Sequence, residues 1–149
     1  MTSIADSDTT TILQRFSQLA LSEGLKKKSK QYKLQRREFI IGEVDTGFST
    51  IFGGNASSLQ SWMSLLRTVG VEGADGMRSI KQCKAALVGK YVNIVDLVDA
   101  AVAGIVMTSG VFTSSKALGK YMKRTGKTFP RNKAKTNQLL RQFLIRINE

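Results

Sequence analysis

The sequence contains no histidine, one cysteine and one proline in 149 residues. Without histidine the chain lacks the commonest general base, the Ser-His-Asp and Cys-His pairs, and most catalytic zinc sites. A single cysteine, Cys83, excludes an internal disulfide and fits a reducing compartment. We therefore predict a non-enzymatic protein that needs no cofactor and no metal.

The chain also lacks a long apolar run, and its first residues do not have the pattern expected of a leader. Its most apolar segment, Ile94–Met107, is short and is interrupted by Asp96 and Asp99, so it does not suit a membrane span. The first eight residues, MTSIADSD, have acids in place of the cationic and apolar regions of a secretory signal. We expect an intracellular protein without integral membrane association.

Acidic residues are scarce beside basic ones. Lysine and arginine number 23 against 11 aspartates and glutamates, which gives a net charge of +12. The excess is clustered, because residues 26–37 hold seven cations and residues 116–146 hold ten, both without an acid. Such clustering favours a polyanionic partner: nucleic acid, an anionic membrane surface or an acidic protein. The alternative is a solvated surface that has no partner.

Apolar residues recur at helical spacing along most of the chain, and glycines follow the periodic segments as helix stops. The pattern predicts an all-α fold: a single compact domain over residues 1–149, with six or seven helices, one long central helix and frayed residues 1–9. The expected N-caps are Thr9–Thr11, Asn55 or Ser57, Ser79, Asn93, Ser114 and Asn132, and the second helix should start near Lys26–Ser29. Residues 90–92 look extended, and residues 101–112 would permit a short strand for which no clear partner strand is visible.

The long helix, from about residues 26–29 to Phe52, has two chemical halves. At 100° per residue its basic positions fall on the same face as its apolar positions. The basic positions are Lys26, Lys30, Lys33 and Arg37, and the apolar positions are Ile40, Val44, Phe48 and Ile51. Either the basic half extends beyond the core, or the helix breaks between the halves. Gly42 and Gly47 weaken the helix prediction.

A second basic stripe lies on the helix expected after Ser114, with Leu118, Tyr121 and Met122 on the opposite face. Together the two stripes predict a nucleic-acid-binding surface with little sequence preference, and the first also resembles a nuclear import signal, which favours the nucleus. The proposed contacts are Lys26, Lys27, Lys28, Lys30, Lys33, Arg36, Arg37, Lys116, Lys120, Lys123, Arg124, Lys127 and Arg131. The alternative is a protein-interaction module, effector-like or regulatory, that binds an acidic protein through its charge and the apolar segment Ala100–Phe112.

Two further features favour structural roles. Asp96 and Asp99 follow the expected cap Asn93, where acids favour the helix dipole and Asp96 suits a capping box. Cys83 falls on the inward side of its helix, as a buried and inert thiol does. The opposing hypotheses are that Asp96 and Asp99 are catalytic carboxylates and that Cys83 is a nucleophile.

Several motifs cover most of the chain in a recognisable order. They are FSQLALSEGLKKKSKQYKLQRREF, LQSWMSLLRTVGV, SIKQCKAAL, VNIVDLVDA and LGKYMKRTGKTFPRNKAK. This order resembles a large, fungus-restricted family of small, mostly uncharacterised proteins. The chain departs from that family at GADGMR, where a proline is common, and at AVAGIVMTSG, which is more apolar here. The resemblance implies a fungal or fungus-associated protein with a single domain, and it assigns no activity or site residue.

Overall fold

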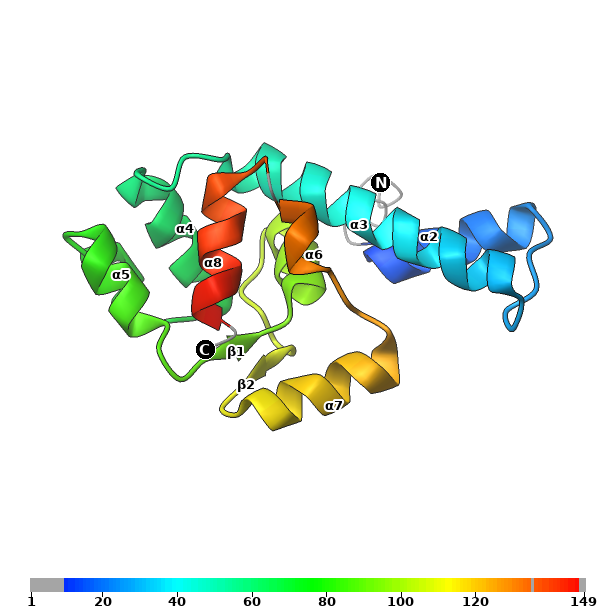
Figure 1. Ribbon diagram of the computed structural model, residues 1–149. Helices are drawn as coiled ribbons and strands as arrows, with labels where there is room; N and C mark the ends of the chain where they lie inside the picture. The colour runs from blue at the N-terminus through cyan, green and yellow to red at the C-terminus, as the bar shows by residue number, and fades with distance from the viewer. Residues whose placement is uncertain (1–9, 135, 148–149) are drawn as a thin grey trace, which may run out of the picture.

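The computed structural model describes residues 10–134 and 136–147, and its longest element is the helix α3, Lys30–Phe52 (Figure 1). Ser29 caps this helix by accepting a hydrogen bond from the Tyr32 N–H at 3.0 Å. The helix continues through Gly42 and Gly47 without a break and ends at Gly53, whose φ is 80°. At 23 residues it is about 34 Å long. The prediction of one long central helix is confirmed.

The two halves of α3 have different neighbours. Its second half packs into the core through Ile40, Val44, Phe48 and Phe52. Ile51, predicted to face inward, is 38% exposed, because Phe52 takes the buried position.

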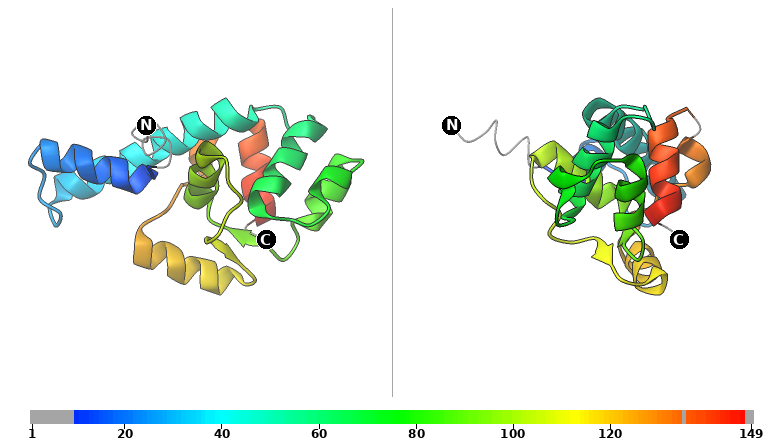
Figure 2. Two further views of the ribbon diagram at one scale, coloured as in Figure 1. Left: turned by 180° about the vertical axis from the view of Figure 1, so that it is seen from behind. Right: turned by 90° about the vertical axis from the view of Figure 1, so that its left-hand side faces the viewer.

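The first half of α3 extends beyond the body and pairs with α2 (Ile12–Ser22) to form a helical hairpin, which we call the arm (Figures 1 and 2). Phe16 of α2 holds the arm together. Its ring centroid lies 5.2 Å from that of Tyr32 and 5.6 Å from that of Phe39. The basic half therefore overhangs the core, as one of the two alternatives predicted.

The body is formed by the remaining helices around one apolar cluster, in which Trp62, Leu97 and Phe143 are fully buried. The described residues form seven α-helices, which confirms the mostly all-α, single compact domain. Beyond α2 and α3, the elements are α4 (Leu59–Val69), η1 (Ala74–Gly76), α5 (Ile80–Ala86), α6 (Ile94–Ala103), α7 (Ser115–Thr125), η2 (Arg131–Ala134) and α8 (Gln138–Ile147). The predicted fraying of residues 1–9 lies outside the described residues. Among the described helices, none combines the length and the apolar character needed to cross a membrane.

Two predicted caps are wrong. Ser58, not Asn55 or Ser57, accepts the capping hydrogen bond of α4, because Asn55 instead accepts one from the Ser57 N–H in the preceding turn. Asn132 falls within η2, and the buried Asn137 begins α8 by accepting a hydrogen bond from the Leu140 N–H at 2.8 Å. The caps that the structure confirms are Thr11, Ser79, Asn93 and Ser114, and the cap Ser29 lies within the range predicted for the start of α3.

A two-stranded antiparallel pair is the one departure from helix among the elements of the described chain. The strand β1 (Tyr91–Val92) lies in the segment predicted as extended, and its partner is β2 (Val111–Phe112). Residues 101–112 thus contain both the end of α6 and a strand. The pair is short, and α7, which contacts both strands, supplies the packing that an isolated pair would lack.

Gly47 allows α3 to lie close against α6. A Cβ atom added there would be 2.6 Å from Cγ1 of Val98, a buried and β-branched side chain. Gly42, one and a half turns earlier on α3, is exposed and a Cβ there would meet nothing within 4 Å. The two glycines of α3 therefore have different roles.

This difference predicts opposite effects of the same substitution. Gly42→Ala should raise the free energy of unfolding by up to about 1 kcal/mol, since alanine favours the helix. Gly47→Ala should lower it, because overpacking costs about 1–3 kcal/mol and outweighs that gain. Urea denaturation of both variants measures the two changes in the free energy of unfolding. Equal shifts of the two midpoints would contradict the close α3–α6 approach.

Candidate nucleic-acid interface

The first basic cluster lies on the arm. Lys26, Lys27 and Lys28 precede the cap Ser29, so they occupy the turn at the tip of the arm rather than the helix. Lys30, Lys33 and Arg37 lie on α3 itself and are exposed. The predicted helical stripe is correct for these three residues, and Lys26 does not belong to it.

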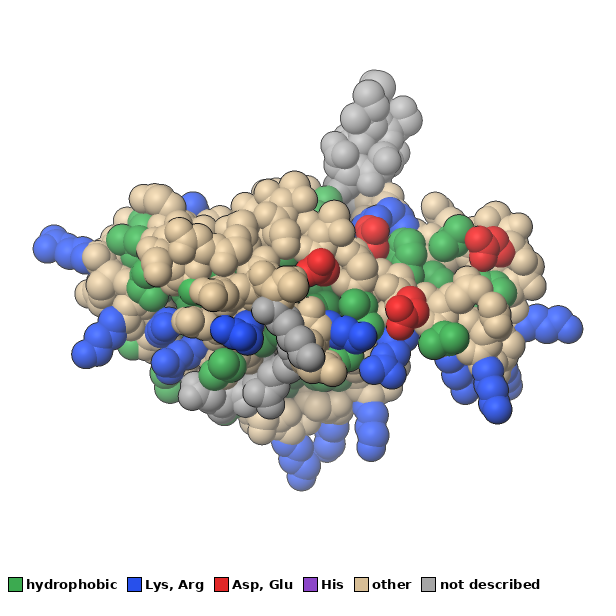
Figure 3. Space-filling model, turned by 45° about the horizontal axis from the view of Figure 1, so that its top comes forward, with side chains coloured by type: hydrophobic (Ala, Val, Ile, Leu, Met, Phe, Trp, Pro, Cys, Tyr) green, Lys and Arg blue, Asp and Glu red, His purple; other side chains and the backbone are tan. Residues whose placement is uncertain are grey.

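The second basic cluster lies on α7, which is amphipathic. Leu118 faces the body and is buried, whereas four cations point into solvent. These are Lys116, Lys120, Lys123 and Arg124. In the space-filling view, lysine and arginine side chains project along the lower edge of the molecule, and the acidic side chains visible on this face lie above them (Figure 3).

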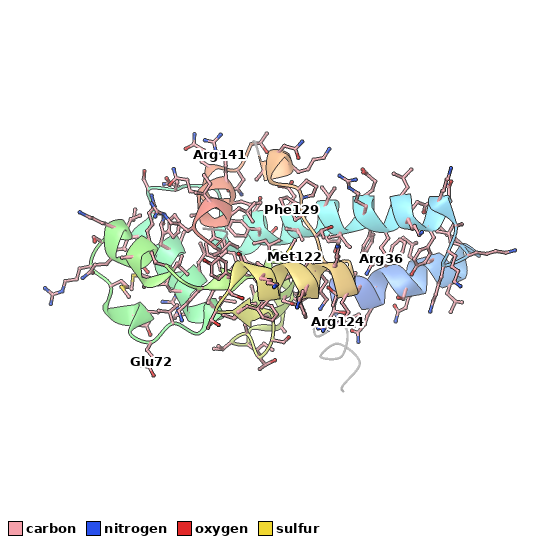
Figure 4. The ribbon with its side chains drawn as sticks, turned by 60° about the horizontal axis from the view of Figure 1, so that its bottom comes forward. Arg36, Glu72, Met122, Arg124, Phe129 and Arg141 are labelled. Carbon is pink, nitrogen blue, oxygen red and sulfur yellow. The ribbon has the colours of Figure 1, made fainter. Side chains whose placement is uncertain are left out.

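Arg36 connects the two clusters. Its guanidinium donates hydrogen bonds from Nη2 to the Thr125 carbonyl at 2.8 Å and from Nη1 to the Gly126 carbonyl at 3.3 Å. These carbonyls end α7, where the helix dipole favours a cation. Gly126 has a φ of 73°, and the guanidinium occupies the space that a Cβ atom there would need. Figure 4 shows Arg36 beside this end of α7 and Arg124 on the same helix.

Lys127, predicted as part of the second stripe, turns inward. Its ammonium forms an ion pair with Asp96 Oδ1 at 2.7 Å and donates to the Tyr121 hydroxyl at 3.1 Å. The Tyr121 hydroxyl in turn donates to Asp96 Oδ2 at 2.6 Å. Because Gly126 ends the helix, helical spacing does not apply to Lys127, and the sequence already contained that signal. Arg131 begins η2, and its side chain is not among those described.

Asp96 is therefore the centre of a buried polar cluster. Its side chain is 10% exposed, and Gly110 leaves room for it, because a Cβ there would be 2.5 Å from Oδ2. The Asn93 side chain caps α6 at the Asp96 N–H, as predicted, and also donates to the Lys127 carbonyl at 2.9 Å. The capping box is not formed, because the Asn93 N–H donates to the Gly110 carbonyl at 2.7 Å instead.

The pKa values of two groups in this cluster, Tyr121 and Lys127, are raised above their ordinary values. Burial and the hydrogen bond to the Asp96 carboxylate raise the pKa of Tyr121. Burial disfavours the ammonium of Lys127, yet its hydrogen bonds to Asp96 and Tyr121 outweigh that effect and raise its pKa. Both shifts stabilise the protonated forms that the cluster uses.

Asp99 anchors the arm in a comparable way. Its Oδ1 accepts a hydrogen bond at 2.9 Å from the Ile12 N–H, the first of α2. Burial raises the pKa of this carboxyl, and the hydrogen bond partly opposes the rise. Asp96 and Asp99 both line a pocket of about 290 Å³ together with Lys127. Because both carboxylates already accept hydrogen bonds from the fold, the structural role explains their positions.

Within the described part of the chain, few other residues are candidates for catalysis or metal binding. Cys83 is fully buried, and burial raises the pKa of its thiol, which disfavours the reactive thiolate. No three Cys, Asp or Glu side chains of the described residues come together in a way that could hold a metal ion. Comparisons with protein-family models, curated proteins and solved structures gave no match to this chain. Its membership of a fungus-restricted family stays a prediction.

The cluster around Asp96 predicts a loss of stability at alkaline pH. The folded-state pKa values of Tyr121 and Lys127 lie above their ordinary values of 10.0 and 10.5. Their contribution is therefore complete below pH 10 and is lost as the pH rises through the raised values. Urea denaturation between pH 8 and 11.5 should show falling stability, and Tyr121→Phe should flatten this fall. Tyr32→Phe, on the arm, is the matched control, and an equal flattening there would contradict the assignment.

Proposed function

We propose that this protein is a non-enzymatic, basic protein that binds nucleic acid through phosphate contacts. The observation that carries the proposal is the Arg36 contact, which connects the exposed cations of the arm to those of α7. These cations are 79 to 94 residues apart in the sequence, and the Arg36 contact supports one charged surface that spans both elements. We name this surface the basic face, formed by Lys30, Lys33, Arg37, Lys116, Lys120, Lys123 and Arg124.

Binding at the basic face follows from counterion release. Each ammonium or guanidinium that neutralises a phosphate frees a condensed counterion, so affinity falls steeply with salt. Phosphate contacts position a protein on nucleic acid without reading its sequence. These cations lie on two helices, α3 and α7, whose other faces pack against α2 and the body respectively. This arrangement supports contacts with the phosphate backbone and little sequence preference. The exposed lysines at the tip of the arm also suit a nuclear import signal.

Charge reversal tests the proposal. The triple variants Lys30→Glu/Lys33→Glu/Arg37→Glu and Lys116→Glu/Lys120→Glu/Lys123→Glu should each weaken nucleic-acid binding at least about 100-fold near 0.1 M salt, as loss of several phosphate contacts requires. Fluorescence anisotropy over a salt series measures the change. The matched control reverses three exposed cations of α5 and α8 and the loop before α5: Arg78, Lys81 and Arg141. If the control weakens binding as much, net charge rather than the basic face is responsible.

One observation favours a second candidate, an interaction module for an acidic protein. Val102, Ile105 and Val106 are 45%, 54% and 54% exposed at the end of α6 and in the loop that follows it. Exposed apolar side chains beside a charged surface suit a partner that is steered by charge and held by apolar contact.

This candidate makes a different prediction. A partner held at this loop should be captured from nuclease-treated extract, and Ile105→Ser/Val106→Ser should abolish capture while leaving nucleic-acid binding unchanged. The charge-reversal variants serve as the complementary control, because they keep the loop intact. Capture that disappears with nuclease alone would favour the nucleic-acid function instead.

A further inference from the structure

We infer that the ligand of the basic face is double-stranded nucleic acid, contacted along both of its phosphate strands. The inference rests on the function proposed above and narrows it. Two features support it: the basic face has two rows of cations on separate elements, and every aromatic side chain of the described residues is buried or half-buried.

The aromatic side chains are all committed to the fold. Every Phe, Tyr and Trp of the sequence lies within the described residues, and none of them is exposed. Near the basic face, Tyr32 meets Phe16 edge to face, and the ring of Tyr121 lies 5.1 Å from that of Phe112. Proteins that hold single strands stack successive bases on aromatic rings, and that stacking supplies much of their affinity. The half-buried rings near the basic face already contact other rings, and Arg124 lies over that of Tyr121, so they offer a base little surface.

The cations form two rows on separate elements. The row on the arm, Lys30 to Arg37, extends for about 10 Å, and the row on α7, Lys116 to Arg124, for about 12 Å. The two helices are apart in Figure 1, and the Arg36 side chain crosses between them to reach the last carbonyls of α7. A duplex presents two phosphate strands on either side of a groove, whereas a single strand presents one. Two rows on separate elements, joined by Arg36, therefore suit the two strands of a duplex better than one single strand.

Counterion release gives the size of the expected preference for a duplex over a single strand. With seven contacts, the slope of log affinity against log salt is about −6.3 for a duplex and about −4.9 for a single strand. If the two affinities are equal at 1 M salt, where the electrostatic part has vanished, the duplex binds about 25-fold more tightly at 0.1 M. The buried and half-buried rings offer little stacking to offset this difference.

The test measures anisotropy of the full chain with 16-nucleotide single strands and with 16-base-pair DNA and RNA duplexes, from 50 mM to 400 mM salt. Tighter binding of either duplex by at least about tenfold at 0.1 M is the expected result, and the DNA and RNA arms then show which duplex is preferred. Single strands that bind as tightly as the duplexes would overturn the inference and leave the proposed function intact. No binding of any nucleic acid at 50 mM salt would reject the proposed function itself.

Arg36→Lys tests the two-row geometry without a change in charge. Lysine cannot reproduce the forked pair of hydrogen bonds to the Thr125 and Gly126 carbonyls. Duplex affinity should fall at least about threefold, whereas single-strand affinity should not change. Equal losses for both ligands would contradict the two-row arrangement. The comparison of ligands on the unmodified chain stands even if this variant folds poorly.

Discussion

The rest of the structure depends on the ion pair between Asp96 and Lys127 and on the polar groups that complete it. Isolated buried ion pairs add little net stability, because desolvation offsets the attraction, yet removal of one partner costs about 3–5 kcal/mol. Such a pair fixes the relative positions of its two residues more than it raises the free energy of unfolding. Here it determines where the chain runs after α7, so it fixes the end of α7 that Arg36 reaches. Asp99, one turn later on α6, fixes the start of α2 in the same manner. One helix thus orients both elements that carry the basic face.

The helix α3 connects the core to the arm, and its two halves are held in different ways. Its second half is held by the core and by the close approach of Gly47 to Val98 on α6. Its first half is held by Phe16 of α2, packed against Tyr32 and Phe39, and by the hydrogen bonds of Arg36 to the end of α7. The cations of the arm therefore project from a small aromatic cluster at the edge of the main core, which Phe39 contacts. Their distance from the core explains why seven cations within residues 26–37 are compatible with a folded domain.

The sequence was sufficient for the helices, most of their caps and the exposed cations, because these depend on local spacing. It was insufficient wherever a group found a partner far along the chain. Asn137 caps α8 while it also bonds to Ser49, and Lys127 pairs with Asp96, 31 residues away. The role of Arg36 was hidden for the same reason, since nothing local distinguishes it from Arg37. Only Lys127 left a local signal, the glycine that ends the helix before it.

The same surface creates a conflict between stability and binding. Two rows of cations held near each other repel, and the repulsion is strongest at low salt, where the Debye length exceeds 10 Å. Salt therefore stabilises the free protein at this surface while it weakens phosphate binding. The fold resolves the conflict by neutralising cations selectively. Lys127 receives a carboxylate and Arg36 receives carbonyls, whereas acids are absent from residues 26–37 and from residues 116–146. The cations that the fold requires are compensated internally, and those of the basic face stay exposed, where the proposed phosphate contacts would compensate them.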